Sequence, residues 1–165
     1  ALEGNPWLQE KDWLNMPIPD LIHYVVSYYH QRHRQQLPEL VRLATKVERV
    51  HGDRAECPHG LAALLTETLE DLEQHMLKEE EVLFPMLANG QLTQAQMPIY
   101  VMEREHIEHG QRLEKLLALT NQGIPPQGAC NTWQALYLGI RGFSQDIVEH
   151  IHLENNILFA RCVQE

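Results

Sequence analysis

The sequence is poor in positive charge and has no long apolar run. It contains 13 Lys and Arg residues against 23 Asp and Glu residues, so its net charge is −10 with His neutral. A polyanion would be repelled and no Lys/Arg cluster could release counterions, so no nucleic acid is expected as a partner. An anionic membrane surface is excluded for the same reason. The apolar runs are only a few residues long, so no membrane-spanning helix or secretion signal is expected either.

Paired cysteines and strand-like alternation are also missing. Cys57, Cys130 and Cys162 are odd in number, far apart and outside any C-x-x-C motif. This pattern suits a reducing compartment better than a disulfide framework, and we expect a soluble, cytoplasmic protein with three inert thiols. A chain of 165 residues with 44% hydrophobic content is long enough for one domain with a core.

Four long stretches with helical periodicity lie between the prolines and glycines. They are expected at about residues 19–51, 58–87, 97–119 and 131–161, the last one capped by Asn131. Joined by short loops, they predict an all-α, antiparallel up-down-up-down four-helix bundle. We assign residues 17–165 to this bundle and residues 1–16, which carry Trp7 and Trp13, to an N-terminal arm or linker.

The first expected helix has an inward stripe in steps of three and four residues. Pro38 lies within this stripe and should kink the helix or remove one hydrogen bond. The stripe consists of Ile22, Val26, His30, His33, Leu37, Leu40, Ala44, Val47 and His51.

One motif occurs twice, as HMLKEEEVLF at residues 75–84 and HIHLENNILF at residues 150–159. Both copies have the spacing H-x3-E-x3-L-F. Because positions i and i+4 share a helix face, each copy can direct an imidazole nitrogen and a carboxylate into one site. A buried carboxylate is costly unless it is paired or bound to a metal, and no inward Lys or Arg is available. The motif therefore predicts a bound cation.

A shared metal site requires that all four helices place ligands at the same height along the bundle axis. At 1.5 Å per residue, two further histidines and the two motif histidines lie roughly 14–18 Å from the same end of the bundle. Six ligands, two of them carboxylates able to bridge, suit two ions better than one zinc ion, and non-haem iron is favoured over manganese. A diferric pair would need a further anion such as oxo or hydroxo. The expected metal ligands are His30, His75, Glu79, His106, His150 and Glu154.

The other titratable residues are distinguished from the six expected metal ligands by their positions on the helices. His51 shares the stripe of His30 but lies about 32 Å away along the helix, so it is excluded as a ligand. His33 and His109 are left open between extra ligands, groups that support a ligand, and core histidines. Glu80 and Glu81 rotate away from the core and are expected to be solvated. A supporting or proton-relay role is considered for one of the flanking residues Glu103, Glu105, Glu108 and Glu149.

At this point the residues resemble a known group. The six positions are similar to the hemerythrin-like (HHE) domain. The wider likeness, over about residues 11–162, is to the iron-sulfur cluster repair (RIC) family, also called YtfE or ScdA. Its segments are YHQRHRQQLPEL (29–40), ATKVERVHGD (44–53), HMLKEEEVLFPM (75–86), VMEREH (101–106) and EHIHLENNILF (149–159).

The resemblance implies a non-haem di-iron centre with four terminal His and two bridging Glu at the positions above. It also implies a bacterial cytoplasmic protein, induced by nitric oxide or peroxide stress, that restores damaged iron-sulfur clusters. Members usually carry an N-terminal domain with a paired-Cys motif, which is not found in this sequence. We expect an iron donor whose recipients are damaged iron-sulfur proteins. Nitric oxide reduction and O2 binding or redox sensing remain alternatives, so enzymatic activity is left open.

Overall fold

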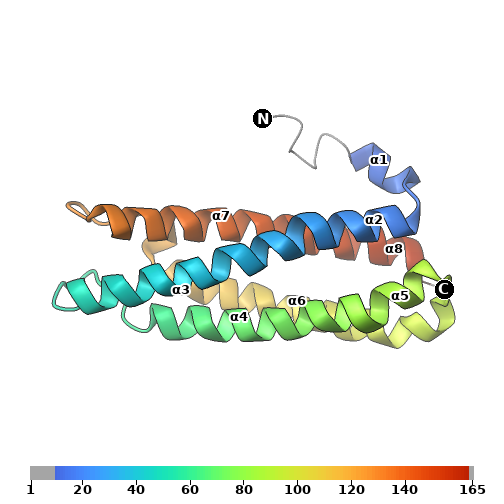
Figure 1. The fold of residues 1–165 in the computed structure, drawn as a ribbon, viewed down its shortest axis with the longest axis horizontal. Coiled ribbons are helices and arrows are strands. Elements are labelled where there is room, and N and C mark those ends of the chain that lie inside the picture. The colour runs from blue at the N-terminus through green and yellow to red at the C-terminus, as the bar shows by residue number, and fades with distance from the viewer. Residues whose placement is uncertain (1–9, 164–165) are drawn as a thin grey trace.

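Apolar residues at every third or fourth position bring four long helical rods together in this computed structural model, which describes residues 10–163 (Figure 1). The first rod consists of α2 (Ile18–Tyr24), the π-helix η3 (Val25–His30) and α3 (Gln31–His51). The second consists of α4 (Leu61–Lys78), the π-helix η4 (Glu79–Leu83) and α5 (Phe84–Ala88). The third is α6 (Leu92–Leu119), which the 3-10 turn η5 (Asn121–Gly123) follows. The fourth consists of α7 (Asn131–Leu153), the π-helix η6 (Glu154–Leu158) and α8 (Phe159–Cys162).

The rods close into a four-membered ring. α3 packs against α4 and α7, and α6 packs against the same two helices, so each rod has two neighbours. Short connections between consecutive rods make neighbours antiparallel, as the sequence predicts. Residues 10–163 contain no strand, and none of their helices has the length and hydropathy needed to cross a membrane.

Polar side chains at mid-height divide the core into two apolar clusters. The proximal cluster lies toward α5 and α8, and the distal cluster fills the other part of the bundle between α3, α4, α6 and α7. Between them, buried histidines and glutamates come from all four rods. The proximal cluster includes Trp13, Leu21, Val25, Tyr29, Phe84, Ile99, Met102 and Phe159. The distal cluster includes Leu37, Leu40, Leu65, Leu72, Leu116, Trp133, Ile140 and Phe143.

Three π-helical segments lie at the level of the polar layer, one on each rod except α6. A π turn closes its hydrogen bonds to the fifth residue rather than the fourth, so it inserts an extra residue and shifts the phase of the buried face. Adjacent residues are therefore both buried, as Leu83 with Phe84 and Leu158 with Phe159. The Leu-Phe pair of the repeated motif thus fills the proximal cluster twice.

The same phase shift corrects the expected stripe of the first rod. Ile22 and Val26 are only partly buried, whereas Leu21, Val25 and Tyr29 are completely buried. The extra residue in η3 moves the buried face back by one position on its N-terminal side. From His30 onward the stripe is as predicted, and α3 continues through Pro38.

The start of α6 and the cap of α7 also differ from prediction. α6 begins at Leu92 rather than near residue 97, because the chain turns at Gly90 and the helix runs on through Pro98. Asn131 is the first residue of α7 and not its cap, and the cap position is held by Cys130 without a side-chain hydrogen bond. The main-chain turn at Pro126 to Ala129 therefore precedes the helix directly.

Within the described part of the segment expected to form an N-terminal arm, residues 10–15 form the short helix α1 (Glu10–Asn15). Trp13 is buried in the proximal cluster beside Tyr24, and its carbonyl accepts a hydrogen bond from Arg161. Helix α1 thus lies against the end of the first and fourth rods (Figure 1). The other tryptophan assigned to the arm, Trp7, lies outside the described residues.

Candidate metal centre

The six residues predicted as ligands lie together in the polar layer. Each is buried, and the two carboxylates are completely inaccessible to solvent. Four rods supply them. They are His30 at the end of η3, His75 on α4, Glu79 at the start of η4, His106 on α6, His150 on α7 and Glu154 at the start of η6.

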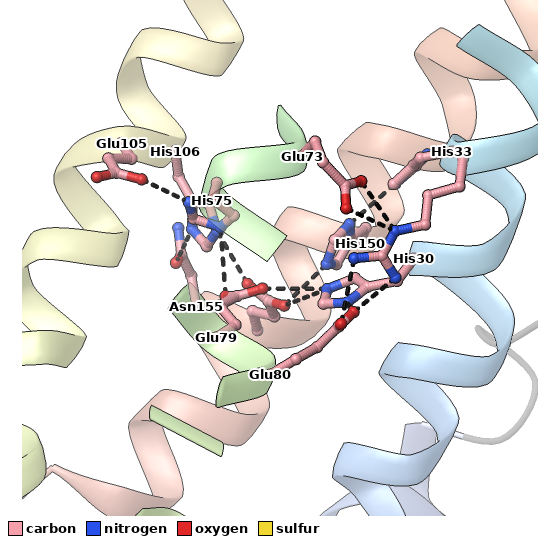
Figure 2. A network of polar contacts seen from close by, with 12 residues as sticks. His30, His33, Glu73, His75, Glu79, Glu80, Glu105, His106, His150 and Asn155 are labelled. Atoms are coloured by element: carbon pink, nitrogen blue, oxygen red, sulfur yellow. Dashed lines mark hydrogen bonds and ion pairs between the residues drawn. The ribbon is translucent and has the colours of Figure 1, made fainter. Parts of the chain in front are cut away.

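Each carboxylate directs one oxygen toward each of two histidine pairs. Oε1 of Glu79 lies 3.1 Å from Nε2 of His30, and Oε2 lies 3.3 Å from Nε2 of His75. Glu154 repeats this division, with Oε2 2.8 Å from Nε2 of His150 and Oε1 2.9 Å from Nε2 of His106. All four imidazoles therefore present Nε2 to the carboxylates (Figure 2).

The ligand atoms fall into two overlapping groups. His30 and His150 form one group with the two glutamates, and His75 and His106 form the other with the same two glutamates. Within each group the ligand atoms lie within 4.8 Å of one another. Carboxylates common to two sets of nitrogen ligands are what a two-ion site with bridging carboxylates requires.

A charged network holds His30 from outside the layer. Its Nδ1 donates to Glu80 at 2.5 Å, and Glu80 accepts two further hydrogen bonds from Arg34. Arg34 also donates to Glu73, so the network joins the first and second rods (Figure 2). The expectation that Glu80 is solvated is wrong. Arg34, four residues after His30 on the same helix face, indicates that a carboxylate could lie beside His30, but it does not indicate which one.

The other three imidazoles are held at Nδ1 as well. His75 donates to Glu105 at 2.8 Å, and Glu105 also pairs with Lys78. His106 donates to the side-chain oxygen of Asn155 at 2.7 Å. The supporting role considered for the flanking glutamates therefore belongs to Glu105. Hydrogen bonds at Nδ1 fix the tautomer and the ring orientation that leave Nε2 free to bind a metal.

His33 is the partner of His150. Its Nε2 lies 2.9 Å from Nδ1 of His150, and both rings are buried. The ring of Tyr29 also stacks in parallel on His150, with centroids 5.2 Å apart. Of the roles left open for His33, the geometry selects support of a neighbouring imidazole.

The comparison with protein families agrees with this geometry. The description of the matching family is "Hemerythrin HHE cation binding domain", and the match covers residues 21–162. The chain belongs to the hemerythrin HHE family. All six clustered residues and their supporting partners lie inside the matched range.

Two curated relatives extend this assignment within the hemerythrin family. Both are named iron-sulfur cluster repair protein YtfE. One, from Yersinia pseudotuberculosis serotype O:1b (strain IP 31758), is 56% identical over 164 residues, which are 99% of this chain and 74% of that protein. The other, from Yersinia pestis (strain Pestoides F), is 55% identical with the same coverage.

In this hemerythrin-family chain, the raised pKa values of two histidines show how the negative charge of the buried carboxylates is balanced. Burial opposes a charge on His30, but Glu154, Glu79 and Glu80 together raise its pKa to about 11. For His75, burial is likewise outweighed by Glu79 and Glu105, and the pKa is raised to about 10. Metal ligands must be neutral imidazoles, so binding of cations here would release protons.

Buried polar atoms that lack a hydrogen-bond partner indicate whether a metal ion fits the polar layer of this hemerythrin-family chain. In the group that contains His75 and His106, four buried nitrogen and oxygen atoms have no hydrogen-bond partner. They nevertheless lie close together, with His75 and Glu79 3.3 Å apart and His106 and Glu154 2.9 Å apart. Each such atom costs roughly 1–3 kcal/mol when it is left unsatisfied. A cation with several ligand positions satisfies all four at once, so the donor set fits a metal ion. The atoms are Nε2 of His75, Oε2 of Glu79, Nε2 of His106 and Oε1 of Glu154.

His51 lies outside both groups of this hemerythrin-family centre, as its height on the helix predicts. Its Nε2 lies 3.2 Å from Sγ of Cys130, and its ring stacks on Trp133 with centroids 5.2 Å apart. Both partners belong to the start of α7, at the distal end of the bundle. His51 thus packs the distal end and does not contact the polar layer.

Proposed function

We propose that this chain holds two non-haem iron ions and takes part in the repair of iron-sulfur clusters damaged by nitrosative or oxidative stress, as an iron donor. The observation that carries the proposal is the division of Glu79 and Glu154 between the two histidine pairs. The relatives named iron-sulfur cluster repair protein support the biological role.

In this proposal each ion has its own imidazoles and shares the carboxylates. His30 and His150 bind one ion, His75 and His106 bind the other, and Glu79 and Glu154 bridge them. Two imidazoles and shared carboxylates leave the coordination of each iron incomplete, which permits an oxo or hydroxo bridge in the oxidised state and exchange in the reduced state. The Nδ1 hydrogen bonds hold the imidazoles in place for this task.

The recipients in this proposal are damaged iron-sulfur proteins in a bacterial cytoplasm. Residues 17–165 act as the metal-binding unit, with the preceding arm covering one end. Neither a nucleic acid nor a membrane surface is part of the mechanism, because the chain carries a net charge of −10.

Metal analysis with Mössbauer spectra of the purified protein tests the centre. We expect two irons per chain and a signature of bridged high-spin iron. Transfer from the reduced protein to an apo-cluster acceptor tests the role. Iron that stays bound in the presence of both acceptor and chelator would remove the basis of the donor function.

Nitric oxide reduction is a second candidate. It is favoured by the shared carboxylates, which place the two groups side by side and would let two NO molecules bind close together. Headspace analysis after adding NO to the reduced, iron-loaded protein decides between the candidates. Production of N2O above background would support turnover, whereas stable binding without N2O would support only capture.

A further inference from the structure

His109 is a half-buried histidine near the layer that belongs to neither metal-binding group and makes no hydrogen bond to any of the six clustered residues. It follows His106 by one turn of α6, and its ring meets the ring of His75 edge to face with centroids 4.7 Å apart. The ring of His106 lies 6.2 Å away on its own helix. Nδ1 of His109 is buried and has no hydrogen-bond partner among the described residues. A nitrogen lone pair or N–H is thus left beside the second histidine pair.

A surface cavity of about 190 Å³ connects His109 with solvent. Its wall holds three acidic residues, Asp71, Glu105 and Glu108, and two basic residues, Lys78 and Arg112, which pair with Glu105 and Asp71, so the charges of the wall sum to −1. Oxygen ligands and an excess of negative charge favour entry of a divalent cation. The wall reaches the layer itself, because Glu105 is the hydrogen-bond partner of His75 (Figure 2).

We propose that His109 is a transfer ligand, which takes a divalent iron ion from the cavity between α4 and α6 and passes it to His75 and His106, and which acts in reverse when iron is released. The inference rests on the proposed function and deepens it by naming the route of the ion. His109 is assigned a temporary role because neither of the two metal-binding groups includes it. Its free nitrogen beside both the cavity and the histidine pair is what a temporary ligand needs.

The experiment compares rates with end points. His109→Phe keeps an aromatic ring against His75 and removes both nitrogens, whereas His109→Gln returns one potential ligand atom. Apoprotein is mixed with Fe(II) or Co(II) under anaerobic conditions, and release is followed with a colorimetric chelator. We expect His109→Phe to slow loading and release by about tenfold, which corresponds to roughly 1.4 kcal/mol in the exchange barrier, at unchanged stoichiometry and affinity. His109→Gln should recover part of the rate.

Three further variants test the cavity as the path of the ion separately from the imidazole ring of His109. Gln74→Trp narrows the cavity mouth and should slow exchange in the same way. Glu81→Trp adds the same bulk at an exposed position on the same rod and should not. His59→Phe, at an exposed histidine remote from the layer, is the control for His109→Phe.

Equal exchange rates in wild type and His109→Phe would overturn the transfer role. A lower stoichiometry in His109→Phe with unchanged rates would also overturn it, since it would make His109 a resident ligand. Failure of the proposed function is a different result, because wild type itself would then bind no iron pair or pass none to an apo-cluster acceptor.

Discussion

At the scale of single residues, the centre depends on two glutamates that no Lys or Arg neutralises. Glu79 and Glu154 are completely buried, and only imidazoles face them. A buried carboxylate is costly unless it is paired, and without metal the pairing comes from His30 and His75, whose pKa values the carboxylates raise. A bound cation can take over this compensating role, which is why the two glutamates give the layer affinity for cations.

Removal of one shared carboxylate should reduce metal content. Glu154→Ala takes an oxygen ligand from both groups, so we expect iron to fall from two ions per chain to one or fewer. Elemental analysis after reconstitution measures the effect. His51→Ala is the matched control, because His51 lies at the distal end, and it should retain both ions. Two ions in Glu154→Ala, or none in His51→Ala, would contradict the assigned geometry.

The supporting glutamates should make the metal-free protein sensitive to acid. Burial opposes the charge of Glu80, but His30 and Arg34 lower its pKa to about 2, and the hydrogen bond from His75 lowers that of Glu105 to about 2 as well. A depressed pKa in the folded state adds stability above the unfolded value near 4.5, and this stability is lost as pH falls toward 2. Melting temperatures of the apoprotein between pH 6 and 2 measure it.

Charge-neutral variants give the control for the acid effect. Glu80→Gln and Glu105→Gln should each flatten the fall in melting temperature below pH 4.5, whereas Glu81→Gln, at an exposed neighbour, should leave it unchanged. An identical slope in all three variants would assign acid sensitivity to other groups.

These supporting contacts also show what could be predicted at this scale. The repeated motif, the position of each histidine along its helix and the lack of an inward Lys or Arg were enough to select all six clustered side chains. Glu80 and His33 could not be assigned in the same way, because their partners lie on other helices and depend on the rotation of each rod. A run of three glutamates offers no local sign of which one turns inward.

At the scale of elements, the π segments are the feature that helical periodicity failed to predict. η4 and η6 begin at the two shared glutamates and occupy the same place in both copies of the motif. Proline is not their cause, because Pro85 follows η4 whereas Ala160 stands at the matching position after η6. The spacing of apolar residues therefore predicts the four helical rods. It does not predict the extra residue in η3, which shifts the buried face in the N-terminal part of the first rod.

The equivalence of the two copies can be tested with proline. Ala160→Pro restores the Leu-Phe-Pro sequence of the first copy, so we expect it to change the free energy of unfolding by less than about 1 kcal/mol. Ala135→Pro, at an exposed position inside regular α7, should cost about 3 kcal/mol or more. Denaturant unfolding measures both. Equal losses would show that the segment after η6 needs its backbone N–H.

At the scale of the whole molecule, the polar layer brings together groups from all four rods that a cation can bind. Metal should therefore stabilise the fold by mass action, by about 2.7 kcal/mol when free metal is 100-fold above Kd. For a chain of this size the melting temperature should rise by roughly 5–10 °C. Thermal unfolding with and without Fe(II) or Co(II) measures the shift. The double variant Glu79→Ala, Glu154→Ala should show no shift, and a full shift there would place the binding elsewhere.

The division of the core into proximal and distal clusters has a consequence for cooperativity. Two apolar clusters separated by a buried polar layer can open one at a time, as independent folding units. Amide hydrogen exchange of the apoprotein should then resolve two levels of protection, one for the distal parts of α3 and α7 and another for η3, α5 and α8. Metal loading should merge the two levels into one, because an ion bound by all four rods makes the opening of either end a global event.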